Sequence, residues 1–214
     1  MSQICCNVHQ LVNEKPHFEY PYETGDIPPN GIYILFETGE FAHGVERIVR
    51  VGTHTGKDKL PSRLREHFIT ENKDRSIFRK NIGRSILNRD NDPFLEQWNI
   101  DLTSKAAKEK YKWQIDFQKL GEVEKQVTEY IQGNIRFVVC AVDNEKERSD
   151  WEKKIITTVA QCECCVPSAG WLGRHSPEAK IRESGLWQLQ HLGGDILDEN
   201  NFDALKTACL NTKP

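Results

Sequence analysis

Residues 31–67 read GIYILFETGEFAHGVERIVRVGTHTGKDKLPSRLREH, and this stretch decides the fold. Gly31–Phe36 is an almost continuous apolar run, typical of a strand that is covered on both faces. Arg47–Thr53 alternates apolar residues with arginines, and it follows so closely that an antiparallel hairpin is the simplest pairing. A short basic helix is predicted next, from Leu60-Pro61, because proline is tolerated in the first turn of a helix.

The predicted helix carries two ridges. Leu60, Leu64 and Phe68 recur every four residues and form the buried ridge. Arg63 and His67 form the adjacent ridge, at the border between core and solvent, where a catalytic cleft can lie. Taken alone, such a pair is more simply explained as a surface arginine beside a packed histidine. The strands that precede it favour a functional interpretation.

A second apolar run, Ile135–Val142, predicts the central strand of the sheet. A helix is expected after it, from about Ser149 to Gln161, with Glu152 in the middle of its apolar face. Two explanations of Glu152 stay open. Ser149-x-x-Glu152 matches a capping box, which needs no chemistry. Alternatively, a bound cation compensates the desolvation of an inward-facing carboxylate.

The remaining chain extends this core. Residues 1–29 contain four prolines and predict an extended arm, Arg75–Arg89 predicts an amphipathic helix, and Ser104–Ile131 predicts one or two helices interrupted near Gly121. We therefore expect an α/β fold, in which helices flank a small three-stranded antiparallel β-sheet. The predicted domain covers residues 30–165, with a helical insertion at about 90–133. Residues 166–214 are expected to be a C-terminal extension packed on the same domain.

The motifs of these segments resemble the GIY-YIG nuclease superfamily. Gly31-Ile32-Tyr33 matches its first motif, Arg50-Val51-Gly52 stands in the place of its second, and Arg63 follows on a helix eleven residues after Gly52. In this family the carboxylate metal ligand lies on a helix directly after the third strand, which is the position of Glu152. The resemblance covers residues 31–67 and 135–161, about a third of the chain, and implies a divalent-metal-dependent phosphodiesterase.

The resemblance also implies a role for each site residue. Tyr33 resembles the phenol that positions or deprotonates the attacking water, and His67 resembles a base or water-orienting group. Arg63 resembles the arginine that holds the scissile phosphate, for which a forked cation suits the geometry. Glu152 resembles the ligand of one Mg²⁺ or Mn²⁺ ion, whose other coordination sites go to water and phosphate oxygens.

Two positions depart from the family pattern. Arg50 replaces the tyrosine of the second motif, so three alternatives stay open: Tyr33 and His67 suffice, Arg50 contacts the phosphate, or the site is impaired. The family also tends to place an asparagine after the metal glutamate. The segment after Glu152 lacks it up to residue 177, and Ser168 and Gln161 are the candidates to replace it.

Charge is distributed unevenly along the chain. The net charge is −3, but Arg47–Arg89 holds twelve basic and four acidic residues, a local charge of +8. Such a segment is expected of a surface that tracks a phosphate backbone, although a solvated helix face gives the same pattern. DNA is the expected partner, and the candidate contacts are Arg50, Lys57, Lys59, Arg65, Arg79, Lys80 and Arg84.

Seven cysteines are an odd number, and no signal-peptide pattern precedes them. We therefore expect a cytoplasmic protein with reduced thiols and no membrane span. Cys162, Cys164 and Cys165 are spaced Cys-x-Cys-Cys, without paired Cys-x-x-Cys knuckles, so structural zinc is disfavoured and packed or free thiols are expected. Cys5, Cys6, His9 and His175 are the other ligand types considered. Trp171 and Trp187 are expected in the core rather than stacked on bases.

These observations predict a metal-dependent endonuclease that hydrolyses phosphodiester bonds, with DNA as the favoured substrate. The alternative is a catalytically degenerate domain that binds nucleic acid or a protein partner without cleavage. A metal-free regulatory or scaffold protein is a third possibility. The oligomeric state is not predicted.

Overall fold

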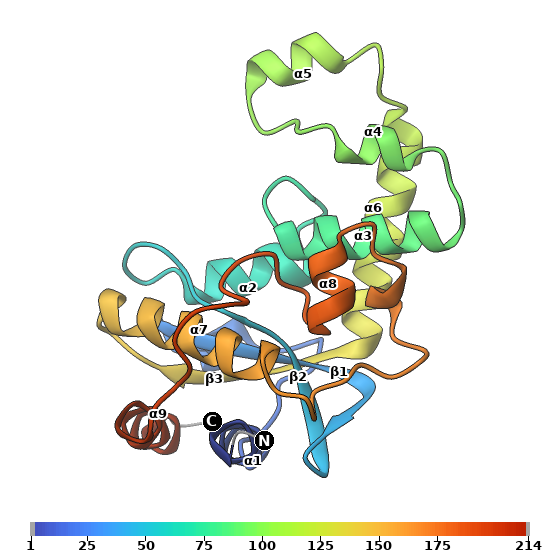
Figure 1. Ribbon diagram of the computed structural model, residues 1–214. Helices are drawn as coiled ribbons and strands as arrows, with labels where there is room; N and C mark the ends of the chain where they lie inside the picture. Colours follow the sequence, from blue (N-terminus) through green and yellow to red (C-terminus); the bar gives the residue numbers. More distant parts are fainter. Residues whose placement is uncertain (1–2, 213–214) are drawn as a thin grey trace.

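The computed structural model describes residues 3–212 and shows a mixed α/β fold. Its three-stranded antiparallel sheet contains β1 (Gly31–Ala42), β2 (Val45–Gly52) and β3 (Ile135–Ala141), in the order β2-β1-β3 (Figure 1). The predicted fold class and hairpin are confirmed. The predicted central position of Ile135–Val142 is wrong, because β1 pairs with both neighbours and leaves β3 at one side.

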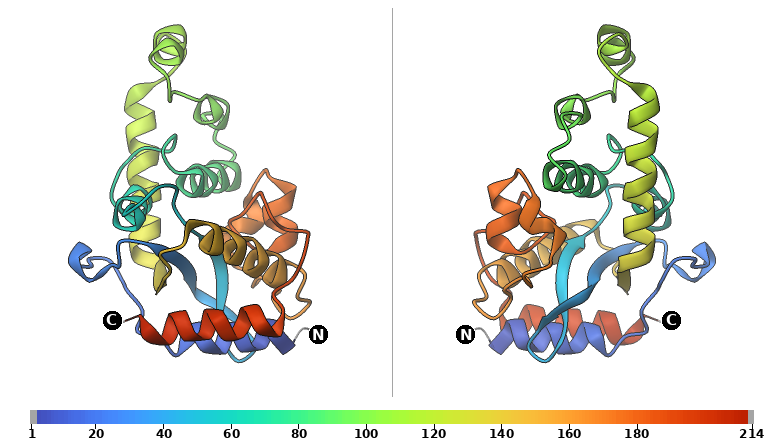
Figure 2. Two further views of the ribbon diagram at one scale, coloured as in Figure 1. Left: turned by 90° about the vertical axis from the view of Figure 1, so that its left-hand side faces the viewer. Right: turned by 90° about the vertical axis from the view of Figure 1, so that its right-hand side faces the viewer.

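Helices cover both faces of the sheet (Figures 1 and 2). Side chains alternate along β1, so Ile32, Ile34 and Phe36 enter one core and Tyr33 and Leu35 enter the other. The first core is covered by α1 (Gln3–Asn13), α7 (Glu145–Ala160) and α9 (Glu199–Asn211). The second is covered by α2 (Leu60–Phe68), α3 (Ile77–Arg89) and α6 (Phe117–Asn134). Tyr33 therefore faces α2 and α3.

Helix α1 corrects the expectation of an extended N-terminal arm. Cys5, Val8, Leu11 and Val12 recur at helical spacing and are buried in the first core. Helices α1 and α9 lie side by side across that face, as both views in Figure 2 show. The arm is extended only after α1, where Phe18 forms an isolated antiparallel bridge with Phe137 of β3.

The segment between α3 and β3 extends away from the sheet (Figure 1). It contains α4 (Leu95–Asn99), α5 (Lys105–Tyr111) and the long α6. The predicted interruption near Gly121 is wrong: Gly121 lies inside α6, and the break falls at residues 112–116. Asp116 accepts a hydrogen bond from the N–H of Lys119 at 3.0 Å and so caps the start of α6.

The C-terminal segment packs against β2 at the edge that does not pair with β1. Its short elements are η2 (Leu172–His175) and α8 (Ala179–Ser184), and a further short turn, η1 (Thr24–Asp26), precedes β1. The backbone N–H of Trp187 donates to the carbonyl of Val49 at 2.8 Å. The indole N–H groups of Trp171 and Trp187 both donate to Glu37, at 2.9 and 2.8 Å. Both tryptophans are buried, which confirms their expected place in the core.

One disulfide, Cys140–Cys209, joins β3 to α9. The expectation of reduced thiols is therefore wrong for this pair. Their Cα atoms lie 4.5 Å apart where α9 packs on β3, a separation that permits a bridge but that spacing along the chain does not reveal. Within residues 3–212 no helix is both long and apolar enough to span a lipid bilayer.

Candidate active site

Tyr33 and His67 form a hydrogen-bonded pair between β1 and α2. The Tyr33 Oη lies 2.7 Å from His67 Nε2, and His67 Nδ1 lies 2.7 Å from the Oγ of Ser76. Ser76 is the N-cap of α3, and its Oγ accepts a hydrogen bond from the N–H of Arg79. Three elements thus orient one phenol and one imidazole, both of them buried.

Steric contacts explain the two motif glycines. Gly52 lies opposite Tyr33 in the β1–β2 ladder, and a Cβ added there would overlap the Tyr33 hydroxyl. A Cβ added to Gly31 would overlap the carbonyl oxygen of Cys140 on β3. Glycine at residue 52 therefore leaves space for the tyrosine ring, and glycine at residue 31 lets two strands approach closely.

We expect Gly52→Ala to lower the free energy of unfolding by about 1–3 kcal/mol, the usual cost of overpacking a closed site. Urea unfolding measures this change. Gly121→Ala is the matched control, because the space around Gly121 is open and its helical position favours alanine. That control should gain about 0.5–1 kcal/mol. Equal effects of the two substitutions would contradict a steric role for Gly52.

His67 is held in its neutral form. Burial is the largest cause that keeps its pKa well below the usual value. The guanidinium groups of Arg50, Arg63 and Arg79 act in the same direction. A neutral imidazole has one nitrogen free to accept a proton, so His67 can accept the phenolic hydrogen bond of Tyr33 while its Nδ1–H donates to Ser76.

This shift predicts a pH dependence of stability. The unfolded chain binds a proton at His67 below its unfolded pKa of about 6.5, whereas the folded chain does so only at much lower pH. The contribution of neutral His67 to the free energy of unfolding is therefore complete above about pH 6.5. It decreases as the pH falls, by up to about 1.4 kcal/mol per pH unit. Urea unfolding at a series of pH values gives the free energy of unfolding of wild type and of His67→Asn. Plotted against pH, the two free energies should converge between pH 6.5 and 5. Parallel curves would exclude this linkage.

Arg63 lies beside this pair on α2. Its side chain is 25% exposed, and its Nη1 donates to the Glu66 carboxylate and to the carbonyl of Arg75, both at 2.9 Å. Burial opposes its charge, but the oxygens of Tyr33 and Glu66 raise the pKa of Arg63 on balance. Arg63 therefore presents a permanent, partly accessible cation next to the Tyr33 hydroxyl.

Glu152 lies one turn further into its helix than the sequence suggests. Helix α7 begins at Glu145, and its N-cap is Asn144, whose side chain accepts from the N–H of Glu147 at 3.1 Å. Ser149 and Glu152 are both inside the helix, so the capping-box explanation is wrong. The carboxylate position must be explained by what surrounds it.

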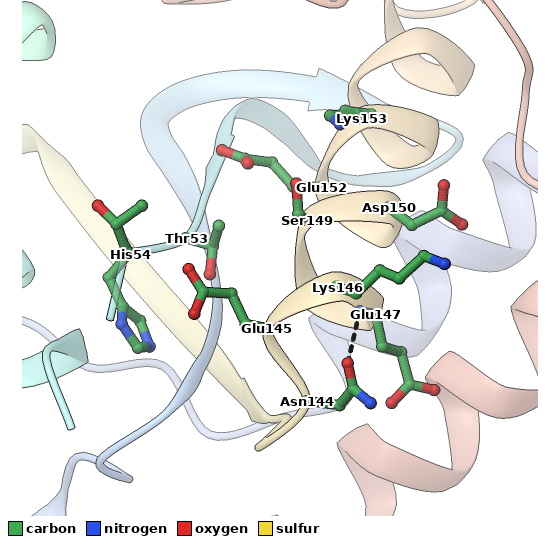
Figure 3. A pocket seen from close by; sticks show the side chains of 11 residues that line it. Thr53, His54, Asn144, Glu145, Lys146, Glu147, Ser149, Asp150, Glu152 and Lys153 are labelled. Atoms are coloured by element: carbon green, nitrogen blue, oxygen red, sulfur yellow. Dashed lines mark hydrogen bonds between the residues drawn. The ribbon is translucent and has the colours of Figure 1, made fainter. Parts of the chain in front are cut away.

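A pocket of about 1130 Å³ surrounds the first turns of α7 and residues 53–55 after β2. Figure 3 shows the Glu152 side chain leaving α7 on the side of Thr53, whereas Asp150 points away from it. Burial raises the pKa of Glu152, while the charge of Arg50 and the backbone N–H of Thr53 oppose that rise. No ion pair involving Glu152 occurs among residues 3–212. The site therefore contains a partly buried carboxylate with room for a cation.

A smaller pocket of about 450 Å³ adjoins the first, and Arg63 lines it. Thr53, His54 and Thr55 line both pockets, so the end of β2 lies between Arg63 and Glu152. The structure thus brings the four predicted catalytic residues, Tyr33, Arg63, His67 and Glu152, to one end of the sheet. His54 was missed by the sequence analysis; its Nε2 accepts from the N–H of Gly31 at 3.3 Å. Its position two residues after the second motif was the available signal.

Residues 3–214 match a family model described as a GIY-YIG domain. The chain belongs to the GIY-YIG family. No curated protein and no solved structure gives a match. Membership agrees with the β2-β1-β3 sheet and indicates a nuclease-type function, since GIY-YIG nucleases act on nucleic acid and generally use divalent metals.

Arg50 takes the place of the second-motif tyrosine in this GIY-YIG domain. It is buried, and its Nη1 donates to the carbonyl of Trp187 and to the Oε1 of Gln188, the latter at 3.0 Å. Its guanidinium also lies 5.4 Å from the centre of the Phe78 ring. Arg50 therefore anchors the C-terminal segment and acts on the site by its charge, which limits the rise in the pKa of Glu152 and adds to the lowering of the pKa of His67.

The other predicted nucleic-acid contacts divide into two groups. Lys57, Lys59 and Arg65 are exposed, and Lys59 lines the smaller pocket. Arg79 is fully buried in an ion pair with Glu124 at 2.8 Å. Two further cations are also paired with carboxylates: Lys80 with Asp74 at 3.4 Å and Arg84 with Glu178 at 3.0 Å. The local charge of +8 thus overstates the surface charge, because several of these cations hold helices together.

Proposed function

We propose that this GIY-YIG domain is a divalent-metal-dependent endonuclease that hydrolyses DNA phosphodiester bonds. The observation that carries the proposal is that Glu152 and Arg63 line two adjoining pockets, while the buried Tyr33–His67 pair lies directly beside Arg63. This arrangement combines a proton acceptor, a phosphate-binding cation and a cation-binding carboxylate at one place.

In the proposed mechanism, the phenol of Tyr33 takes a proton from the attacking water while its own proton passes to Nε2 of neutral His67. Ser76 keeps the imidazole in the required orientation through Nδ1. The water oxygen attacks phosphorus, and Arg63 binds the non-bridging oxygens on which negative charge develops. The phosphorus–oxygen bond opposite the water breaks, the leaving oxygen takes a proton from solvent water, and one DNA strand is cut.

Glu152 is the proposed ligand of one Mg²⁺ or Mn²⁺ ion. The fit rests on its partial burial, on the absence of an ion-pair partner in residues 3–212 and on the preference of these cations for carboxylate oxygens. When bound, such an ion polarises the phosphate and stabilises its developing charge. The surrounding carboxylates of Glu145, Glu147 and Asp150 line the same pocket and add to its attraction for a cation.

DNA is the proposed partner, and the exposed side chains of Lys57, Lys59 and Arg65 are its proposed backbone contacts. Arg50, Arg79, Lys80 and Arg84 are left out of this surface, because each is hydrogen-bonded or paired to protein groups. Binding through three exposed cations should be strongly salt-dependent.

Incubation of supercoiled plasmid, single-stranded DNA and RNA with the protein and Mg²⁺ or Mn²⁺ tests the proposal. Nicked or linear plasmid that forms only with metal supports it. An inert protein that nonetheless shifts DNA in a gel would favour a second candidate, a nucleic-acid-binding domain without cleavage. The observation that favours this candidate is Arg50, which fills the tyrosine position and donates its hydrogen bonds to protein groups.

A further inference from the structure

A second group of chemically reactive side chains lies far from the candidate active site. Cys5 and His9 belong to α1, His43 lies in the turn between β1 and β2, and Cys165 follows α7. One sulfur or nitrogen atom from each of the four lies within 4.8 Å of the other three. His43 is ten residues beyond Tyr33, about 30 Å along an extended chain, so this group is separate from the site described above.

The distances match those of a tetrahedral zinc site. Ligands at the usual Zn–S and Zn–N lengths stand about 3.4–3.8 Å apart in a tetrahedron. The two sulfur atoms of Cys5 and Cys165 are 3.6 Å apart. The Cys165 sulfur lies 3.7 Å from His43 Nε2 and 3.8 Å from His9 Nε2. These three spacings match a tetrahedral site, and every other pair of ligand atoms in the group lies within 4.8 Å.

His9 is oriented as a metal-binding histidine usually is. It is buried, and its Nδ1 donates to the carbonyl of Cys5 at 2.9 Å, which leaves Nε2, 3.8 Å from the Cys165 sulfur, as the nitrogen that can bind a metal. The N–H of Ile48 lies 3.2 Å from the same Nε2, so metal binding exchanges one hydrogen bond for a coordinate bond. The set contains only thiols and imidazoles, a combination that favours zinc over magnesium.

The segment that carries Cys165 has the form of a metal-binding turn. The N–H of Cys165 donates to the carbonyl of Cys162 at 3.0 Å, and the N–H of Cys164 points to the Cys162 thiol. Cys162 and Cys165 are thus spaced Cys-x-x-Cys, a relation that Cys164 conceals in the sequence. The Cys162 sulfur lies 3.4 Å from His43 Nε2 and flanks the four-residue group.

We propose that Cys5, His9, His43 and Cys165 bind a structural zinc ion. Four protein ligands fill a tetrahedral site, which leaves no position for a substrate and so points to a structural role. The ion fastens three segments that are distant in sequence: α1, the β1–β2 turn and the chain after α7. The proposal is independent of nuclease activity, and it reverses the sequence-based preference for packed or free thiols at these positions.

Metal analysis of the untagged protein, purified without chelators, tests the proposal directly. We expect about one zinc ion per chain by inductively coupled plasma mass spectrometry. Cys165→Ser and His43→Ala should lose most of that zinc. The matched controls Cys6→Ser and Cys164→Ser should keep it, because these two thiols are neighbours in sequence but outside the group. Cobalt substitution should give the thiolate charge-transfer absorption and the intense visible bands of a tetrahedral site.

Several results would overturn the proposal. Wild-type protein without zinc, even after refolding with excess zinc, would exclude the site. So would a Cys5–Cys165 disulfide found by peptide mass spectrometry after alkylation. Loss of zinc from Cys162→Ser as complete as from Cys165→Ser would overturn the assignment of the four ligands. Removal of zinc by a chelator should lower the Tm by about 10 °C or more, and an unchanged Tm would exclude a structural role.

Discussion

Replacement of Glu152 by glutamine is expected to reduce metal-dependent DNA cleavage at least about a hundredfold, the effect of losing a principal transition-state contact. Glutamine keeps the shape of the side chain and can still accept the N–H of Thr53, but it lacks the charge that binds a divalent cation. Initial rates of plasmid nicking at saturating Mg²⁺ measure the loss.

Stability separates this effect from misfolding. Because burial raises the pKa of Glu152, its charge costs free energy on folding, and a neutral glutamine should leave the free energy of unfolding unchanged or slightly higher. Millimolar Mg²⁺ should raise the Tm of wild type but not of Glu152→Gln, since only the former binds the ion in its folded state.

Asp150→Asn is the matched control for Glu152→Gln. Asp150 lies on the same helix and lines the same pocket, but it is exposed and pairs with Lys154 at 3.2 Å. Its substitution should change the cleavage rate by no more than a few fold. Equal losses from the two variants would show that the pocket attracts cations by its total charge rather than through Glu152.

The elements that carry the site were predictable because each has a strong local pattern. The apolar run after Gly31 and the four-residue spacing of Leu60, Leu64 and Phe68 predicted β1 and α2. The order of the strands was not predictable. The sequences of β1 and β3 are equally apolar, and the apolar pattern does not show which of the two pairs with a strand on each side. Helix α1 was missed because cysteines and histidine occupy positions that aliphatic residues usually fill.

Charge was the least reliable signal in the sequence. Arg79 and Arg84 contribute to a basic segment, but Arg79 pairs with Glu124, 45 residues away, and Arg84 with Glu178, 94 residues away. A net charge summed along the sequence treats every cation as exposed. Tertiary contacts decide which cations are exposed and which are paired with carboxylates. Tertiary contacts also bring His43 together with Cys5 and His9 of α1 and with Cys165, which follows α7.

Arg63→Ala is expected to reduce cleavage by about a hundredfold or more while leaving the fold intact. The side chain lies beside Tyr33 and its own stabilising contacts are to Glu66 and a backbone carbonyl at the surface, so its removal should cost only about 1 kcal/mol of stability. Thermal unfolding confirms folding, and single-turnover cleavage measures the chemical step.

Arg63→Lys shows which property of the side chain matters. Lysine keeps the positive charge but cannot form two parallel hydrogen bonds to a phosphate, so it should recover only a small part of the lost activity. Arg65→Ala is the control, since Arg65 is exposed two residues away and should affect DNA affinity and its salt dependence more than the cleavage rate. Full recovery by lysine would show that Arg63 contributes charge alone, and equal rate losses at Arg63 and Arg65 would remove Arg63 from the catalytic site.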